Sequence, residues 1–399
     1  MMPDPLNFAA PEAAAPGDLP NDGPAPRPIR VLSCLHSFEP GGVERDVLRF
    51  NGAWRAHGID ACIALGRREG VLEPEAPDVP YFVMQKGGFS TARFETLWMI
   101  LNLPGIIRRV KPDVIFCASN GLAAVAMAMR LILGPSCPPI VLRISNDLVR
   151  RDLKGLTLLL HRIGLRLHAP YHRVIVAMAP PVRDEIIEQM GVDPAAVVVI
   201  NNASMKLADV AAFAKARDAA RREGPGRHFL GVGRLAPQKN FALLIDAFSR
   251  IARDDDKLTI VGEGAQRAFL TQRAAALGIA RQVDLPGHHR GLEQRFAQAD
   301  AFVLSSDFEG VPAVVVEALA AGMPIVATDC CTAMPSLLDG VGRLVPLGDA
   351  AQLAAEMDTI CAADVPVAAM RARAAEFTIE ATVGQWEALF TRLATIPAH

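Results

Sequence analysis

Two glutamates with seven residues between them are the strongest chemical feature of this 399-residue sequence. Glu309 lies in a polar turn after a short apolar run, and Glu317 lies inside an apolar stretch. Pro312 favours a helix start, because its missing N–H would be unpaired there anyway, and Gly322 with Pro324 favours the helix end. A carboxylate buried in such a helix is costly unless it accepts hydrogen bonds. Glu317 is therefore predicted to need a partner.

Glu309 and Glu317 can reach different parts of one elongated ligand. The helical segment from Pro312 to Glu317 is about 7–8 Å long. Carboxylates accept hydrogen bonds from sugar hydroxyls, whereas the amides near Gly310 and Val311 lie at the positive end of the helix dipole, where a diphosphate is favoured. The pattern predicts a sugar at one end, a diphosphate at the helix start and a ribose near Glu317. The alternative is a solvated Glu309 and a Glu317 that bonds the backbone.

A pair of cations follows another apolar run. Gly233 and Arg234 come directly after it, and Lys239 lies just before an amphipathic helical pattern. Arginine offers a planar fork of donors and lysine a point charge, so together they can clamp a diphosphate. Neither the dinucleotide fingerprint nor the phosphate loop of NTPases is present here. Ordinary surface cations are the alternative.

Adjacent glycines precede a third predicted helix. Gly41 and Gly42 let the backbone approach a ligand closely, and the following helix start directs free N–H groups at an anion. A plain turn before a helix would look the same.

Together these segments resemble the retaining glycosyltransferases of family 4, which have the GT-B fold. The matching segments are GGVER from Gly41, GVGRLAPQKNF from Gly231, VGEG from Val261 and FEGVPAVVVEALAAGMPIVAT from Phe308. The resemblance covers nearly all of the chain from residue 29.

The resemblance implies a role for each matching residue. Arg234 and Lys239 would bind the donor diphosphate and act in catalysis with Glu309, which would hold the donor sugar. Glu317 would bind the ribose hydroxyls. The remaining donor-binding residues would be Gly42, Gly233, Gly310 and Val311.

The acceptor side departs from the family pattern. Members often carry a histidine on the first domain after the strand that corresponds to residues 139–145, but here Arg143, Asn146 and Asp147 occupy that neighbourhood. These three are the predicted acceptor-side residues. Asp147 could orient an acceptor hydroxyl or cap a following helix.

The whole chain is predicted to be an α/β protein of the GT-B type, with two Rossmann-like, doubly wound domains facing an inter-domain cleft. Short apolar runs rich in β-branched residues alternate with helical patterns, as in parallel sheets covered on both faces. Seven runs begin at residues 29, 59, 80, 113, 139, 173 and 196, and six more lie between residues 228 and 347. The predicted parts are a disordered Pro/Ala-rich tail over residues 1–28, an N-terminal acceptor domain over 29–205, a linker over 206–226, a C-terminal nucleotide-sugar domain over 227–380 and a helix over 381–399 that crosses back to the N-terminal domain.

Composition narrows the function further. The formal net charge of −2 argues against a general nucleic-acid binder. The seven cysteines form no C-x-x-C pair, which favours a reducing compartment and no metal site. No run is long enough to span a membrane.

His288 and His289 lie where the family's loop approaches the base. A stacking or backbone role and plain solvation both stay open.

Residues 143–173 carry seven Lys or Arg and two Asp, with apolar residues between them. Such a segment can dock on an anionic membrane surface, and a solvated helix face is the equal alternative. The predicted location is cytoplasmic, or peripheral on the inner face of the cytoplasmic membrane.

The resulting hypothesis is a retaining, metal-independent hexosyltransferase with no cofactor besides its co-substrate, a nucleoside diphosphate sugar. Its acceptor would be a glycan or a lipid-linked glycan in cell-surface synthesis. A nucleotide-sugar epimerase and a catalytically silent nucleotide-sugar-binding protein are the competing hypotheses, and a sugar phosphorylase would need a covalent cofactor or a longer chain.

Overall fold

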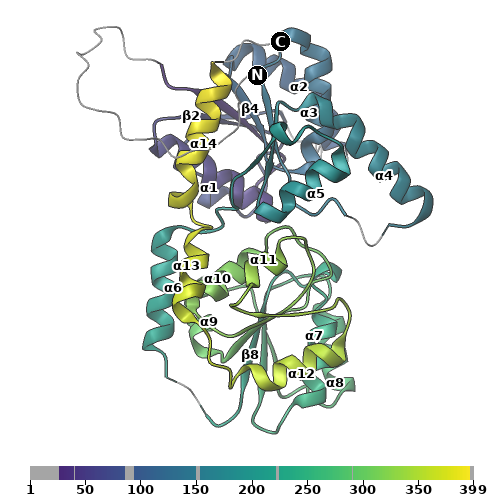
Figure 1. Cartoon of the computed structure of the whole chain (residues 1–399), viewed down its shortest axis with the longest axis vertical. Coiled ribbons are helices and arrows are strands. Elements are labelled where there is room, and N and C mark those ends of the chain that lie inside the picture. The colour runs from purple at the N-terminus through teal and green to yellow at the C-terminus, as the bar shows by residue number, and fades with distance from the viewer. Residues whose placement is uncertain are drawn as a thin grey trace, which may run out of the picture.

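A computed structural model describes residues 27–39, 41–85, 94–149, 153–221, 224–289 and 291–395. Two α/β domains, each built on a parallel sheet, follow one another along the chain (Figure 1). This architecture confirms the predicted fold class. Most of the expected tail, residues 1–26, lies outside the described residues, but Arg27 makes an ion pair with Asp113 of the first domain at 2.7 Å.

The first sheet has seven parallel strands, one for each apolar run predicted there. Their order across the sheet is β3-β2-β1-β4-β5-β6-β7. The bounds are β1 (Arg30–Leu35), β2 (Asp60–Leu65), β3 (Tyr81–Val83), β4 (Val114–Cys117), β5 (Ile140–Arg143), β6 (Val174–Ala177) and β7 (Val197–Val199).

Helices cover both faces of this sheet, which is why its strands are apolar throughout rather than alternating. In β1, Val31 faces the cluster formed with α1 and the C-terminal helix α14, whereas Leu32 faces the cluster formed with α2 and α3. The helices are α1 (Gly42–Ala56), α2 (Glu95–Val110), α3 (Ala123–Leu133), α4 (Gly155–His168) and α5 (Pro180–Met190). Five short 3₁₀ turns lie at Glu73–Glu75, Asn120–Leu122, Gly134–Ser136, Ala169–Tyr171 and Pro194–Ala196.

The second sheet has six parallel strands in the order β10-β9-β8-β11-β12-β13. They are β8 (His228–Val232), β9 (Lys257–Val261), β10 (Val283–Gly287), β11 (Ala301–Leu304), β12 (Ile325–Thr328) and β13 (Arg343–Val345). The helices are α7 (Phe241–Ile251), α8 (Arg267–Ala276), α9 (Glu293–Gln298), α10 (Ala313–Ala321), α11 (Met334–Leu338), α12 (Ala350–Ile360) and α13 (Val367–Ala375), with a 3₁₀ turn at Pro237–Lys239.

The segment expected to be a linker, residues 206–226, instead contains helix α6 (Leu207–Ala219). This helix packs against α9, α10 and α13 of the second domain. Val210 and Phe213 are its buried residues, and the Phe213 ring meets Phe296 edge-on. Two buried side chains on an alanine-rich helix are enough to fix it on the second domain.

Two segments cross side by side between the domains. Met205 pairs with Thr378 in a parallel bridge, and the Ile379 amide donates to the Met205 carbonyl at 3.0 Å. After this crossing, α14 (Ile379–Ala394) runs back along the first domain, as Figure 1 shows in yellow. Trp386 is its anchor, because its ring packs among Phe50, Trp54 and Phe116.

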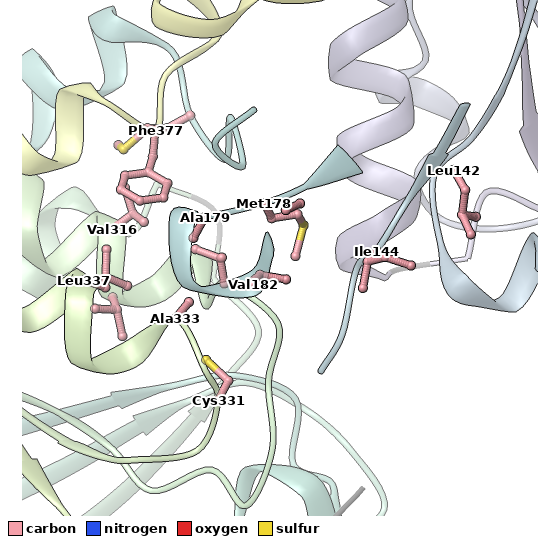
Figure 2. Packing of buried hydrophobic residues seen from close by; sticks show 14 of the residues in the cluster. Leu142, Ile144, Met178, Ala179, Val182, Val316, Cys331, Ala333, Leu337 and Phe377 are labelled. Atoms are coloured by element: carbon pink, nitrogen blue, oxygen red, sulfur yellow. The ribbon is translucent and has the colours of Figure 1, made fainter. Parts of the chain in front are cut away.

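Apolar side chains also join the domains beside this crossing. Met178, Ala179 and Val182 follow β6 in the first domain, and they share one buried cluster with second-domain residues. Figure 2 shows Ala179 and Val182 close to Val316 and Ala333 of the second domain. The two domains are therefore held by a continuous apolar core and not by polar contacts alone.

None of the described helices has the length and hydropathy that a membrane span requires.

Trp386→Ala should lower the free energy of unfolding by about 3–5 kcal/mol, because it empties a fully buried aromatic site between α14 and the first sheet. Urea unfolding monitored by circular dichroism measures this change. Gln385→Ala is the control, since its side chain is exposed on the same helix. Equal stabilities of the two variants would contradict the anchoring role of Trp386.

Candidate active site

The candidate site lies where the carboxyl ends of the two sheets face each other, the usual ligand position in doubly wound sheets. A cavity of about 850 Å³ opens between the two domains along α1, and of the predicted donor-binding residues Glu317 lies on its wall. Its walls come from α1, from the domain crossing near Met205, from His288, His289 and residues 291–293, and from Glu317 on α10. Both domains thus contribute side chains to one space.

The Lys239–Glu309 ion pair joins two of the predicted site residues. The Lys239 Nζ lies 2.5 Å from Glu309 Oε1, and the Ser306 hydroxyl donates to the same oxygen at 2.7 Å. Both charged side chains are largely shielded from solvent. The pair therefore places one cation and one carboxylate of the predicted site next to each other.

Further hydrogen bonds join the loops that carry this pair. The Ser305 hydroxyl donates to the Lys239 carbonyl, and the Gln238 side chain donates to the Phe308 carbonyl at 2.8 Å. Asn240 donates to the Asp307 carboxylate at 2.7 Å and also caps α7. The loops after β8 and β11 consequently form one rigid unit.

Gly233 is held in place by another glycine. Its φ of +156° is open to glycine, and a Cβ at Gly262 would lie 1.8 Å from the Gly233 carbonyl oxygen. The Lys239 side chain passes over Gly233, within 3.2 Å of where a Cβ would stand. The glycines thus let the chain ends of β8 and β9 meet beneath Lys239.

Arg234, the second predicted cation, is exposed and makes no ion pair with a described residue. Its charge reaches Glu44 on α1 of the first domain. Burial raises the pKa of the Glu44 carboxyl, and Arg234 partly opposes that rise. Arg234 is therefore available to an anion in the cleft, with Glu44 as a neighbour that sequence reasoning missed.

The start of α10 presents free backbone donors. Pro312 occupies the N-cap position, one residue before the helix, instead of the first helical position. The N–H groups of Gly310 and Val311 donate to no described residue. Unpaired donors at the positive end of a helix favour an anion.

Gly310 also lies in close contact with the first domain. A Cβ there would lie 2.1 Å from the carbonyl oxygen of Ser145 in the first domain. By contrast, a Cβ at Gly42 would meet nothing within 4 Å. Gly310 is needed for domain contact, whereas the space beside Gly42 is open to a ligand.

Glu317 carries a carboxylate without a partner. Its Oε2 is buried and accepts no hydrogen bond, although the side chain as a whole is partly exposed. Burial raises the pKa of Glu317 to about 7, against an ordinary 4.5, and Arg49 and Arg45 oppose that rise. Oε2 thus has no hydrogen-bond partner among the described residues, and Glu317 lies on the wall of the cavity.

Arg143, predicted on the acceptor side, lies inside the first domain instead. Its side chain is 1% exposed and pairs with Asp46 at 2.7 Å and with the Asn202 side chain at 2.7 Å. The guanidinium also lies 5.1 Å from the centre of the Phe50 ring. Because these contacts bury the side chain, Arg143 braces α1 and offers no surface to an acceptor.

Asn146 and Asp147 do lie at the cleft, but their surroundings differ and do not assign one role to both. Asn146 is exposed. Asp147 does not cap α4; its Oδ2 accepts a hydrogen bond of 2.9 Å from the Thr332 amide of the second domain. Asp147 therefore links the domains, on the same side as the Gly310 contact.

Asn120 holds the loop that carries these residues. Its Oδ1 accepts from the Ser145 amide at 2.8 Å, and its Nδ2 donates to the Asn146 carbonyl at 3.2 Å. Its position just after β4 was the available signal, since polar residues at strand ends line such clefts.

His288 and His289 border the cavity on the second-domain side. The His289 Nε2 lies 3.2 Å from Arg295. Within the described residues, no group of three or more His, Cys, Asp or Glu is placed to hold a metal ion.

The fold and this site define a two-domain glycosyltransferase of the GT-B class. The model of the glycosyl transferases group 1 matches residues 213–378, and that of glycosyltransferase family 4 matches residues 40–203. The chain is 32% identical over 376 residues to a phosphatidyl-myo-inositol mannosyltransferase of Mycolicibacterium smegmatis, which covers 86% of this chain and 88% of the relative. The chain belongs to glycosyltransferase family 4.

Two further matches agree with this assignment. The corresponding enzyme of Mycobacterium leprae is 29% identical over 84% of this chain and 87% of its own length. Among solved structures, HepE of Anabaena in complex with UDP has a TM-score of 0.68 at 20% identity, covering 92% of this chain and 100% of that one. At that identity the structural likeness concerns the fold.

Gly42→Val should weaken binding of a nucleoside diphosphate sugar at least tenfold and leave the melting temperature nearly unchanged, because the added side chain enters open space in the cleft. Gly310→Ala should instead lower the melting temperature, because its methyl group collides with the Ser145 carbonyl. Calorimetry and thermal unfolding measure the two effects. Undiminished donor binding by Gly42→Val would place the ligand elsewhere.

Glu317→Gln should raise the melting temperature at pH 8 and much less at pH 5. The folded-state pKa of about 7 exceeds the ordinary 4.5, so the wild type loses stability as pH rises through that range. The glutamine carries no charge to bury. Thermal unfolding without ligand checks this, with Glu387→Gln, an exposed glutamate on α14, as control. A melting-temperature difference that does not change with pH would contradict the burial argument.

Proposed function

We propose that this glycosyltransferase moves a sugar from a nucleoside diphosphate sugar to an acceptor hydroxyl and keeps the anomeric configuration. The observation that carries the proposal is the unpaired, buried oxygen of Glu317 on α10, the same helix whose start presents the free amides of Gly310 and Val311. The Glu317 oxygen needs hydroxyl donors, and the amides of Gly310 and Val311 need an anion. A nucleoside diphosphate supplies both, because its ribose carries hydroxyls and its diphosphate is an anion.

The donor is oriented by these groups along the cleft. The diphosphate lies against the start of α10, with Arg234 and Lys239 as its cations. The ribose hydroxyls donate to Glu317, and the nucleobase faces His288 and His289. The sugar lies at Glu309, where its hydroxyls replace part of the present bonding from Lys239 and Ser306.

In the transition state the sugar carbon is cationic and the leaving diphosphate gains charge. Arg234, Lys239 and the free amides stabilise the growing charge on the leaving group, which lowers the barrier more than it tightens ground-state binding. These donors supply the stabilisation that a bound metal ion would otherwise give, so we propose metal-independent transfer. The departing phosphate accepts the proton of the acceptor hydroxyl on the same face of the sugar, which retains its configuration.

The acceptor in this proposal is a cell-surface glycan or a lipid-linked glycan. Two relatives that span most of the chain are named for transfer to phosphatidyl-myo-inositol, which supports an acceptor of that kind. The HepE complex with UDP supports a nucleoside diphosphate donor. The acceptor would enter beside the loop of residues 144–149, opposite Glu309.

Arg234→Ala and Lys239→Ala should each lower kcat at least a hundredfold, because each removes a cation from the leaving group. Sugar release and transfer from a panel of nucleoside diphosphate sugars measure this, and the anomeric configuration of the product is read by NMR. Arg250→Ala, an exposed arginine on α7, is the control. Near-normal transfer by both cation variants would overturn the assignment, and an isomerised donor formed without acceptor would favour an epimerase.

A further inference from the structure

Helix α4 is apolar on two opposite faces. Its inward face carries Leu165, which is buried, and Leu158. Its outward face carries five large apolar side chains that are between 44% and 69% exposed: Leu156, Leu159, Leu160, Ile163 and Leu167. These positions recur every three or four residues, so they form one stripe along the helix. We call them the leucine stripe.

The leucine stripe is left uncovered by the rest of the described chain. The opposite face of α4 already contacts α3 and α5. Figure 1 shows α4 projecting from the side of the first domain. Stripes of this kind on a soluble surface mark an interaction site.

The charged residues of α4 and of the segment that follows it all have one sign. Residues 153–183 contain five Lys or Arg and no Asp or Glu, in a chain whose net charge is −2. Arg162 and Arg166 stand immediately before Ile163 and Leu167, and both are exposed and unpaired among the described residues. Cations therefore follow one edge of the leucine stripe.

This charge pattern selects between two occupants. A second copy of the chain related by a two-fold axis would place the stripe against itself. Arg162 and Arg166 would then approach their own counterparts, with no acid in the segment to offset them. Anionic lipid headgroups offset the cations while the acyl region takes up the apolar side chains.

We propose that α4 docks this protein on an anionic membrane surface, with the leucine stripe buried at the boundary between headgroups and acyl chains. Arg162 and Arg166 lie at the headgroup level. The docking does not depend on the proposed transfer reaction.

The position of α4 connects this docking to the cleft. The loop before it is fixed by Glu185, whose Oε1 accepts from the amides of Leu148 at 2.5 Å and Val149 at 2.9 Å. His161 of α4 bonds the Leu148 carbonyl at 3.0 Å. The same loop contains Ser145, which touches Gly310 at the sugar end of the site. If the proposed function holds, a docked α4 brings that end of the cleft to an acceptor carried by a membrane lipid.

Vesicle flotation of the full chain tests the docking. The wild type should float with phosphatidylcholine vesicles that contain phosphatidylglycerol and far less with phosphatidylcholine alone. Leu160→Ser/Ile163→Ser and Arg162→Glu/Arg166→Glu should each lower the partition coefficient at least tenfold. The matched controls lie on the second domain: Phe269→Ser/Leu277→Ser, two exposed apolar residues, and Arg250→Glu.

Three outcomes would overturn the proposal: no flotation with anionic vesicles, equal flotation of stripe variants and controls, or a wild-type dimer in sedimentation that the stripe variants lose. Melting temperatures near wild type verify that the variants are folded. Donor-induced thermal shifts are measured on the same samples without lipid. A donor response without flotation would reject only the docking, and flotation without a donor response would reject only the proposed function.

Discussion

The Lys239–Glu309 ion pair is the interaction on which the donor side of the cleft depends. A largely shielded ion pair contributes little net stability, because desolvation offsets much of the Coulomb attraction. Its consequence here is geometric. It fixes the loops after β8 and β11 relative to each other, with support from Ser306 and Asn240. The free protein thus holds a cation and a carboxylate at short range, and a ligand that is anionic at one end and rich in hydroxyls next to it can replace each partner without leaving either charge unpaired.

Glu317 contrasts with this pair. Glu309 is buried with a cation and a hydroxyl, whereas Glu317 has a buried oxygen without a hydrogen-bond donor and a raised pKa. Both glutamates come from one short strand–loop–helix unit, so their difference arises from what faces them. Glu309 faces its own domain, while Glu317 faces the cavity and the arginines of α1. Glu317 Oε2 therefore receives no hydrogen bond from the described part of its own domain, and a donor to it has to come from the cleft.

The sequence predicted most of the strands and local motifs, but few of the contacts between residues that are far apart in the chain. The thirteen strands were visible because buried parallel strands are continuous apolar runs. Lys239 and Glu309 are neighbours in the structure because they follow β8 and β11, which are adjacent strands. Helix α6 was missed, since only two of its residues are buried and its composition is that of a linker. Arg143 was misplaced because its partners Asp46 and Asn202 stand 97 and 59 residues away.

Asp147 shows the same limit and explains how the cleft is closed. Its partner Thr332 is 185 residues distant, so no local pattern announces the bond. That bond and the Gly310–Ser145 contact lie on one side of the cleft, and the crossing near Met205 and Thr378 forms another connection between the domains. Any widening about this crossing has to break the Asp147 bond and expose the apolar residues between the domains in Figure 2. Apolar burial thus holds the domains together, and the contact between Asp147 and Thr332 orients them. The loop of residues 144–149, fixed by Asn120 and Glu185, therefore meets the start of α10 at a defined place.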